Sequence, residues 1–244
     1  MYTERRGQTS VLVWLIAVAI LMVVIMLLLP ATQLERVGPR PLSCRSCLKQ
    51  IGLSLHVYHE HYGSFPPAYI ADAGGRPMHS WRVLLLPFME EKKLYELYRF
   101  DEPWDGPNNR KLHGEMVRVF ACPHNRGKQP ETETNYLAVV GPQTMWPGEK
   151  ATKWSEIKDG SSNTIMVVEV HGSGIHWMEP RDLHMVQMSI AINPARGQGV
   201  SSGHPHGATF LFADGRVQFL PDETPPDALR AALTIAGGEK TALP

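Results

Sequence analysis

The sequence has 244 residues, of which 43% are hydrophobic and 20% charged, so it is long enough to fold around one sizeable core. Lysine plus arginine and aspartate plus glutamate each total 24, which gives a formal net charge of zero. Because no basic excess is available to neutralise phosphates, this composition argues against nucleic acid as a partner.

An apolar segment lies close to the N-terminus. Residues 11–29, VLVWLIAVAILMVVIMLLL, contain no polar or charged side chain. As a helix they would extend roughly 28 Å at about 1.5 Å per residue, which matches the hydrocarbon core of a bilayer. We predict a retained membrane anchor over residues 1–30, because the segment is longer than the apolar part of a secretory signal. The predicted location is the inner membrane, with a single pass, the short N-terminus inside and the head domain outside the cytoplasm. The alternative is a secreted protein cleaved near Ala31.

The residues after the anchor predict a linker and then a helix. Prolines and a glycine interrupt residues 31–42, so we expect a linker there and a head domain over residues 43–244. A helix is predicted from about Ser43 to a glycine cap at Gly63, since apolar residues recur at spacings of three and four. Those residues are Leu48, Ile51, Leu55, Tyr58 and Tyr62. The later segment SWRVLLLPFMEEKKLYELYRF is also predicted to be helical, with a break at Pro87.

The second half of the sequence predicts strands. Short apolar runs bounded by Gly, Pro, Asn and Asp occur in VRVFACP, TNYLAVVGP, NTIMVVEVHG and GATFLFADGRVQFL. In the last of these, Asp214-Gly215 predicts a two-residue type I′ hairpin turn, with Phe212 facing Val217 and Phe210 facing Phe219. Thr224 is expected to cap a short C-terminal helix. The predicted fold class is α+β, with an antiparallel sheet packed on a helix.

The three cysteines suggest a covalent cross-link. Cys44 and Cys47 form a single C-x-x-C, and Cys122 is followed by Pro123 and His124. Outside the cytosol such thiols tend to pair, so we predict a disulfide between Cys122 and either Cys44 or Cys47. A zinc site made by the three cysteines and His124 is the less favoured alternative, because one C-x-x-C without a second pair is a weak zinc motif.

Other side chains are weaker candidates for metal ligands. His56, His59 and Glu60 lie on the predicted helix at spacings that bring pairs of them onto one face, and His204 and His206 could join a metal site. Solvated histidines are the more economical interpretation. No resident cofactor is therefore predicted, although zinc or calcium binding stays open.

Two further motifs have ordinary structural explanations. Asp101, Glu102 and Asp105 in FDEPWDGPNN could ligate calcium, but their spacing is not that of an EF-hand and turn formation is favoured. Residues 199–203, GVSSG, match the G-x-S-x-G pattern of hydrolases, but a strand rather than a helix is expected to follow, and no histidine lies beyond His206. The sequence therefore offers no coherent catalytic constellation.

Several segments, in chain order, resemble the domain of unknown function 1559 proteins that are abundant in planctomycetes. They are RRG at residues 5–7 before the apolar span, CLKQIGLSLHVYHEHYGSFPPA, SWRVLLLPFMEEKKLYELYRFDEPWDGPNNRKL, FACP, DGSSNTIMVVE and an H-x9-D-G element. The motif residues, whose role in the family is unknown, are His204, Asp214, Gly215, Asp159, Gly160 and Asn163.

This resemblance implies a protein similar to pilins or type II secretion pseudopilins, with an N-terminal helix in the membrane and an α+β head. The family has no established reaction, so the resemblance implies no catalytic residues. Prepilins usually carry a glutamate soon after the processing glycine, whereas Gly7 is followed here by QTSVLVWL without an acid, which favours an anchor over a filament subunit.

We therefore expect a non-enzymatic envelope protein anchored through residues 11–29. Its expected partners are pseudopilin or envelope proteins, and no small-molecule substrate is predicted. The alternative is an envelope metal-binding module or metalloenzyme that uses the helix histidines.

Overall fold

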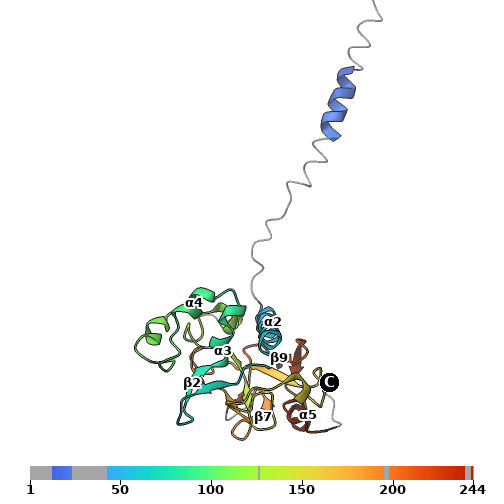
Figure 1. Ribbon diagram of the computed structural model, residues 1–244. Helices are drawn as coiled ribbons and strands as arrows, with labels where there is room; N and C mark the ends of the chain where they lie inside the picture. Colours follow the sequence, from blue (N-terminus) through green and yellow to red (C-terminus); the bar gives the residue numbers. More distant parts are fainter. Residues whose placement is uncertain (1–12, 24–42, 126, 195–197, 240–242, 244) are drawn as a thin grey trace, which may run out of the picture. The chain divides into compact units, whose positions relative to one another are not determined.

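The computed structural model describes residues 13–23, 43–125, 127–194, 198–239 and 243 (Figure 1). The chain divides into two compact units, Met1–Leu42 and Ser43–Pro244. In the first unit, residues 13–23 are helical. None of the helices in the described part of the chain has both the length and the apolar character of a membrane span. Residues 1–12 and 24–30 of the predicted anchor, and the whole predicted linker at 31–42, lie outside the described residues.

The second unit begins with helix α2, Cys44–Tyr62, which confirms the predicted helix. Ser43 caps its N-terminus by accepting a hydrogen bond from the Ser46 amide, and Gly63 ends it in the left-handed conformation at φ 73°. Leu48, Ile51 and Leu55 form its buried face. The predicted apolar stripe does not continue to the end of the helix, because the Tyr62 side chain is 56% exposed.

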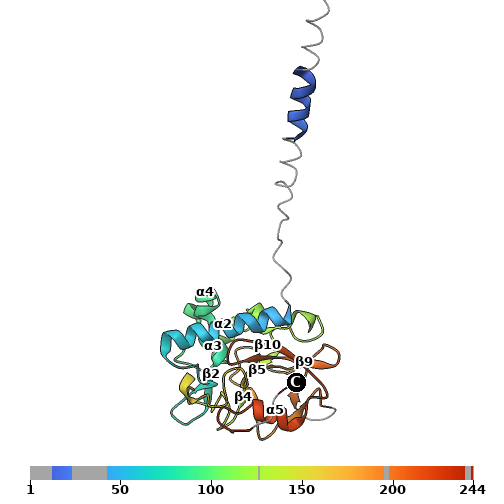
Figure 2. The same cartoon turned by 90° about the vertical axis from the view of Figure 1, so that its right-hand side faces the viewer.

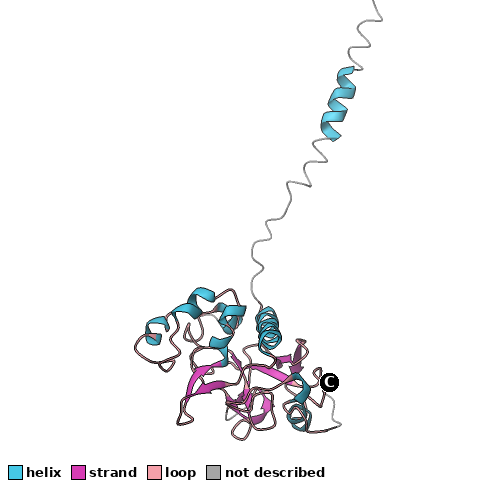
Figure 3. Cartoon of the chain, viewed as in Figure 1, coloured by secondary structure: helices cyan, strands magenta, loops and turns pink. Residues whose placement is uncertain are grey.

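A four-stranded antiparallel sheet lies among the strands drawn in magenta in Figure 3. Its strand order is β10-β9-β5-β3. Its strands are β3 Tyr136–Leu137, β5 Ile165–Glu169, β9 Gly207–Phe212 and β10 Val217–Pro221. Helix α2 contacts β9 and β10. Gly52 permits this close approach, since a Cβ there would lie only 2.8 Å from Leu211 Cδ1. The α+β class and the antiparallel sheet packed on a helix are confirmed.

The opposite face of the sheet is also covered, so β9 is buried along its whole length. Figure 2 shows α5, Pro226–Ala232, on the side of the sheet away from α2. Phe210 and Phe212 of β9 belong to the apolar cluster there, together with Leu229 and Leu233. Burying each such side chain contributes about 1.5–3 kcal/mol relative to leaving it exposed. Alternation along β9 therefore sends Leu211 to α2 and the two phenylalanines to α5.

Shorter elements complete the head. The remaining strands are β1 Tyr69–Ala71, β2 Pro77–Ser80, β4 Val139–Val140, β6 Leu183–His184, β7 Ser189–Ile192 and β8 Gly199–Val200. The remaining α-helices are α3 Trp81–Leu84 and α4 Lys92–Leu97. The 3-10 helices are η1 Leu86–Phe88, η2 Asn109–Leu112, η3 Arg118–Phe120, η4 Pro123–Asn125 and η5 Trp154–Glu156.

A buried ion pair links α3 to the segment before β6. Arg82 and Asp182 have side chains that are 0% and 2% exposed, and the guanidinium donates to the carboxylate. Asp182 also accepts hydrogen bonds from the Ala138 amide at 2.8 Å and from Trp81 Nε1 at 3.2 Å. With these donors the buried carboxylate is well satisfied, which is the condition for a charge to be tolerated away from water.

The hairpin between β9 and β10 forms at Asp214-Gly215, but its predicted register is wrong by one residue. Val217 pairs with Leu211 and Phe219 pairs with Thr209. The reason is the turn: only Gly215, at φ 79°, has a positive φ, whereas a type I′ turn needs positive φ at Asp214 as well. The Phe212 amide bonds to the Arg216 carbonyl and the Gly215 amide to the Phe212 carbonyl, so the loop is longer than two residues.

Two other expectations are wrong in detail. VRVFACP forms the 3-10 helix η3 instead of a strand, and Phe120 is buried there between Trp81 and Trp177, with ring centroids 6.0 and 5.9 Å away. The apolar residues of this segment therefore serve aromatic packing and do not form a strand. Thr224 does not cap α5, whose cap position is Pro225; the Thr224 hydroxyl donates instead to the Pro221 carbonyl at 2.6 Å.

Candidate functional site

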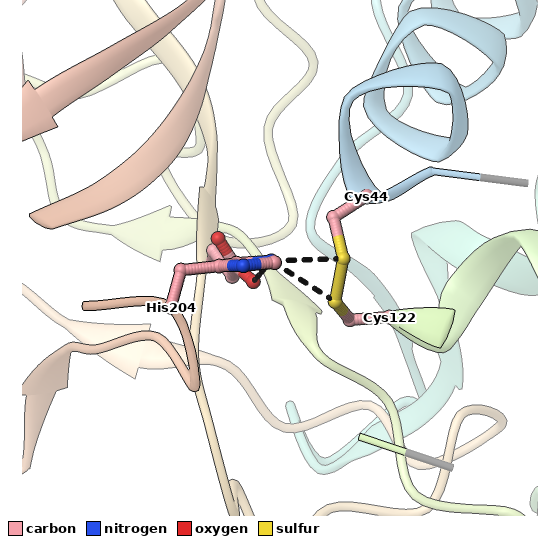
Figure 4. Close-up of side chains that lie close together, drawn as sticks. Cys44, Cys122 and His204 are labelled. Carbon is pink, nitrogen blue, oxygen red and sulfur yellow. Dashed lines mark hydrogen bonds and ion pairs between the residues drawn. A yellow bond between two sulfur atoms is a disulfide. The ribbon is translucent and has the colours of Figure 1, made fainter. Parts of the chain in front are cut away.

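Four residues that are typical metal ligands meet at one edge of the head. Cys44, Cys122, Glu169 and His204 each place a ligand atom so that all of these atoms lie within 4.8 Å of one another. Among the residues that the structure describes, no other group of three or more His, Cys, Asp or Glu side chains is arranged in this way. Cys44 begins α2, Cys122 follows η3, and His204 lies in the loop before β9 (Figure 4). Glu169 ends β5.

The two cysteines of this cluster form a disulfide across 78 residues of sequence. Of the two pairings that the sequence left open, the structure has Cys44 with Cys122. Cys47 lies one helical turn further along α2, is fully buried, and directs its sulfur toward the Ala121 carbonyl at 3.9 Å. The cross-link therefore ties the first turn of α2 to the chain that leads into the sheet.

Glu169 brings a buried carboxylate to the cluster. Its side chain is 0% exposed, and one oxygen, Oε2, accepts a hydrogen bond from the Thr209 amide at 3.2 Å. The other oxygen, Oε1, is buried and has no hydrogen-bond partner in the described part of the chain. Burial raises the pKa of Glu169, and the Thr209 amide offsets part of that shift. An unsatisfied buried carboxylate oxygen is costly, so its presence here calls for an explanation.

His204 lies between the carboxylate and the disulfide. Its Nε2 atom is 3.2 Å from Cys44 Sγ, 3.8 Å from Cys122 Sγ and 3.9 Å from Glu169 Oε1. The side chain is 32% exposed, so the cluster has one solvent-accessible member. The His204 amide donates to Ser202 Oγ at 3.1 Å, which helps to fix the loop that presents the ring.

The surroundings of the cluster are polar and partly open. The His124 ring packs against His204 at 4.6 Å between centroids. Asn125 is buried, and neither Oδ1 nor Nδ2 of its side chain has a hydrogen-bond partner in the described residues. A pocket of about 420 Å³ begins beside Cys122 and is lined by Arg118, Asn125 and Gln129 among others. This pocket therefore reaches the side of the cluster that carries Cys122.

The DGSSN motif has a structural use. Asp159 accepts hydrogen bonds from the Gly237 amide at 2.7 Å and the Gly238 amide at 2.9 Å, which holds the segment after α5. Asn163 donates to the Asp159 carbonyl at 3.0 Å, and Gly160 takes a positive φ of 94° in the same turn. These contacts favour turn formation as the role of the motif.

The H-x9-D-G element does not form one site. His204 precedes β9, whereas Asp214 and Gly215 follow it, so the length of the strand, about 20 Å at about 3.3 Å per residue, separates them. The Asp214 amide donates to the Ser161 carbonyl at 3.1 Å, and the Gly215 carbonyl accepts from Lys49 Nζ at 2.8 Å. Asp214 and Gly215 thus join the DGSSN turn to α2. His204 belongs to the disulfide cluster, which consists of Cys44, Cys122, Glu169 and His204.

The helix histidines lie elsewhere. The rings of His56 and His59 pack against Phe65 at 5.9 and 4.7 Å and against Trp154 at 5.7 and 6.0 Å. Burial lowers the pKa of His56, which disfavours its charged form. Glu60 is exposed, and none of the three belongs to the cluster of potential ligands. His206, also considered as a ligand, is exposed and outside the cluster.

The other candidate motifs form local hydrogen bonds. Glu102 accepts from the Asn108 amide at 2.7 Å and the Asn109 amide at 2.6 Å, while Asp101 pairs with Arg99 at 3.0 Å. Asp105 is exposed. In GVSSG, the Ser201 hydroxyl accepts from the His171 amide at 3.1 Å and Gly199–Val200 forms β8.

Sequence reasoning missed Glu169 and the proximity of His204 to the cysteines. In the sequence, Glu169 follows four apolar residues in NTIMVVEVHG and looks like the end of a strand. In the structure it is buried with that strand, which is unusual for an acid. His204 lies 160 residues from Cys44, so no local spacing could connect them.

A family model described as a protein of unknown function (DUF1559) matches residues 36–189 and 172–227. No curated protein and no solved structure matches the chain. The matched stretches include all four residues of the disulfide cluster and both motif turns, and they confirm the resemblance drawn from the motifs. Since they cover most of the sequence, the chain belongs to the DUF1559 family of proteins of unknown function.

Proposed function

We propose that this protein is a non-enzymatic, membrane-anchored envelope protein whose head, residues 43–244, works outside the cytoplasm as a pilin-like binding module. The observation that carries the proposal is the Cys44–Cys122 disulfide. Stable disulfides form in oxidising compartments and are rare in the cytosol. A head that depends on one therefore belongs on the outer side of the inner membrane.

The position of the disulfide fits an anchored protein. The chain enters the head at Ser43, and the cross-link begins at the next residue. A force transmitted through the preceding segment would therefore reach the disulfide before it could unwind α2. The apolar residues 11–29 provide the expected membrane segment.

The pilin-like part of the proposal rests on the packing of the head. An N-terminal helix lies on a sheet whose strands are all antiparallel, which is the arrangement that the family resemblance implies. The carboxylates of Asp159 and Asp182 hold backbone amides. The expected partners are pseudopilin or other envelope proteins.

Fractionation combined with the intact N-terminal mass of the native protein tests this proposal. We expect the protein in the membrane fraction with an N-terminus at or near Met1, and a protease added outside the inner membrane should remove the head. A start at Gln8 with a methylated amine would support assembly into a pseudopilus. A cytosolic protein, or a soluble one that starts near Ala31, would contradict the anchored form.

A further inference from the structure

The disulfide cluster contains two potential metal-ligand atoms that are not part of the disulfide. Glu169 Oε1 is buried without a hydrogen-bond partner in the described residues, and it lies 3.9 Å from His204 Nε2. The His204 ring points toward the two sulfurs (Figure 4). Two sulfurs, one imidazole nitrogen and one carboxylate oxygen form a donor set that suits zinc, which prefers four ligands in a tetrahedron.

The distances from His204 to the two sulfurs are close to those of a zinc site. With Zn–S bonds of about 2.3 Å and a Zn–N bond of about 2.0 Å, the sulfur-to-nitrogen edge of the tetrahedron is about 3.5 Å. His204 Nε2 lies 3.2 Å from one sulfur and 3.8 Å from the other. The largest change needed concerns the sulfurs, which must separate to about 3.8 Å, and this can happen only after the bond between them is broken.

We propose that reduction of the Cys44–Cys122 disulfide converts this cluster into a zinc site whose ligands are Cys44, Cys122, Glu169 and His204. The site has two exclusive states, a disulfide without metal and a dithiolate with zinc. This inference does not depend on the proposed function, because an anchored head with a permanent disulfide would satisfy that proposal equally well.

The chemistry balances with a dithiol as the reductant. The dithiol gives up two electrons and two protons and becomes a disulfide, while the bond between Cys44 and Cys122 breaks to leave two thiols. Zinc then replaces the thiol protons, which pass to solvent. The partly exposed side chain of His204 (32%) and the pocket beside Cys122 are the two places where the cluster comes nearest to solvent.

The first test measures zinc binding to the full-length chain in its two redox states. The protein, in mild detergent, is dialysed against Zn²⁺ under oxidising conditions or with a phosphine reductant, and bound metal is measured by atomic emission. We expect one zinc per reduced chain and almost none per oxidised chain. A reduced chain that binds no zinc, or equal binding in both states, would overturn the inference.

Variants identify the ligands. His204→Ala removes a partly exposed ligand, and Glu169→Gln keeps the shape of a buried one; each should weaken zinc binding by at least about tenfold, the loss that even outer-shell partners of zinc sites cause. Cys47→Ala and His124→Ala are the matched controls and should bind as the unaltered chain does. Loss of binding in these controls, with retention in His204→Ala, would assign zinc to a different set of residues and refute the proposal.

If a ligand variant folds poorly, a redox measurement on the unaltered chain tests the proposal instead. Zinc that binds only the dithiol must shift the thiol–disulfide equilibrium of the unaltered chain toward the dithiol. At a zinc concentration 100 times the dissociation constant, the equilibrium constant for oxidation should fall about 100-fold. An equilibrium that zinc does not move would contradict the two-state site.

Discussion

Reducing the Cys44–Cys122 disulfide should cost the head a large part of its stability. The bond closes a loop of 78 residues. In the chain-entropy treatment, a loop of that size lowers the entropy of the unfolded chain by about 15 cal/mol/K, which corresponds to about 4.5 kcal/mol at 25 °C. Most domains are stable by only about 5–15 kcal/mol, so the reduced head should lie near the lower limit.

The assay is urea unfolding of the oxidised and the reduced full-length chain, with a chelator present so that metal binding does not contribute. Tryptophan fluorescence is a suitable probe because Trp81, Trp146 and Trp177 are all buried in the head. We expect the oxidised chain to be more stable by about 4.5 kcal/mol. Cys47→Ala should keep this difference, whereas the double substitution of Cys44 and Cys122 by alanine should abolish it.

Two results would refute the reasoning. One is a difference below about 1 kcal/mol in the unaltered chain, which would mean that the loop is already constrained when the protein is unfolded. The other is a difference that persists in the doubly substituted chain, since the reductant would then act elsewhere.

Three further predictions concern the head. Asp182→Ala should lower the free energy of unfolding by about 3–5 kcal/mol, because it leaves the buried guanidinium of Arg82 unpaired. Asp72→Asn, which removes the charge from the more exposed pair with Arg76, should change it little. Equal effects of the two substitutions in urea unfolding would contradict the burial argument. Gly215→Ala should lower the free energy of unfolding by about 1–2 kcal/mol, because a φ of 79° is unfavourable for alanine. Gly114→Ala, at a position with open space around it, should not be destabilising, and urea unfolding measures both variants. Burial lowers the pKa of His79 below its ordinary value of 6.5, so the unfolded chain binds the proton more tightly and stability must fall as the pH drops below about 6.5. His79→Gln should therefore lose less stability than the unaltered chain between about pH 7.5 and pH 5, and an unchanged pH dependence would count against this assignment.

Local sequence rules predicted the parts of the fold that local chemistry determines. Helix α2 follows from Ser43 as a cap, Gly63 as a stop and the periodic apolar residues between them. The hairpin position follows from Asp214-Gly215, but its register depends on which of those two residues takes a positive φ, and the dipeptide alone does not specify that.

Contacts between distant segments determine the features that local sequence rules did not predict. Residues 118–120 alternate like a strand, yet Phe120 is held by two tryptophans from distant segments, so aromatic packing overrides the pattern. The disulfide cluster is harder still to predict. Its members come from a helix start, a loop, a strand end and a second loop, and only the folded sheet brings Glu169 and His204 to the cysteines.

The most direct test of the anchored, extracytoplasmic head is the redox state of Cys44 and Cys122 in the native cell. Intact cells are treated with a membrane-permeant alkylating reagent, and the cysteine peptides of the membrane and cytosolic fractions are identified by mass spectrometry before and after reduction. We expect Cys44 and Cys122 to be joined and to become labelled only after reduction. If both are alkylated beforehand, in a protein recovered from the cytosol, the head does not work outside the cytoplasm and the proposal is wrong.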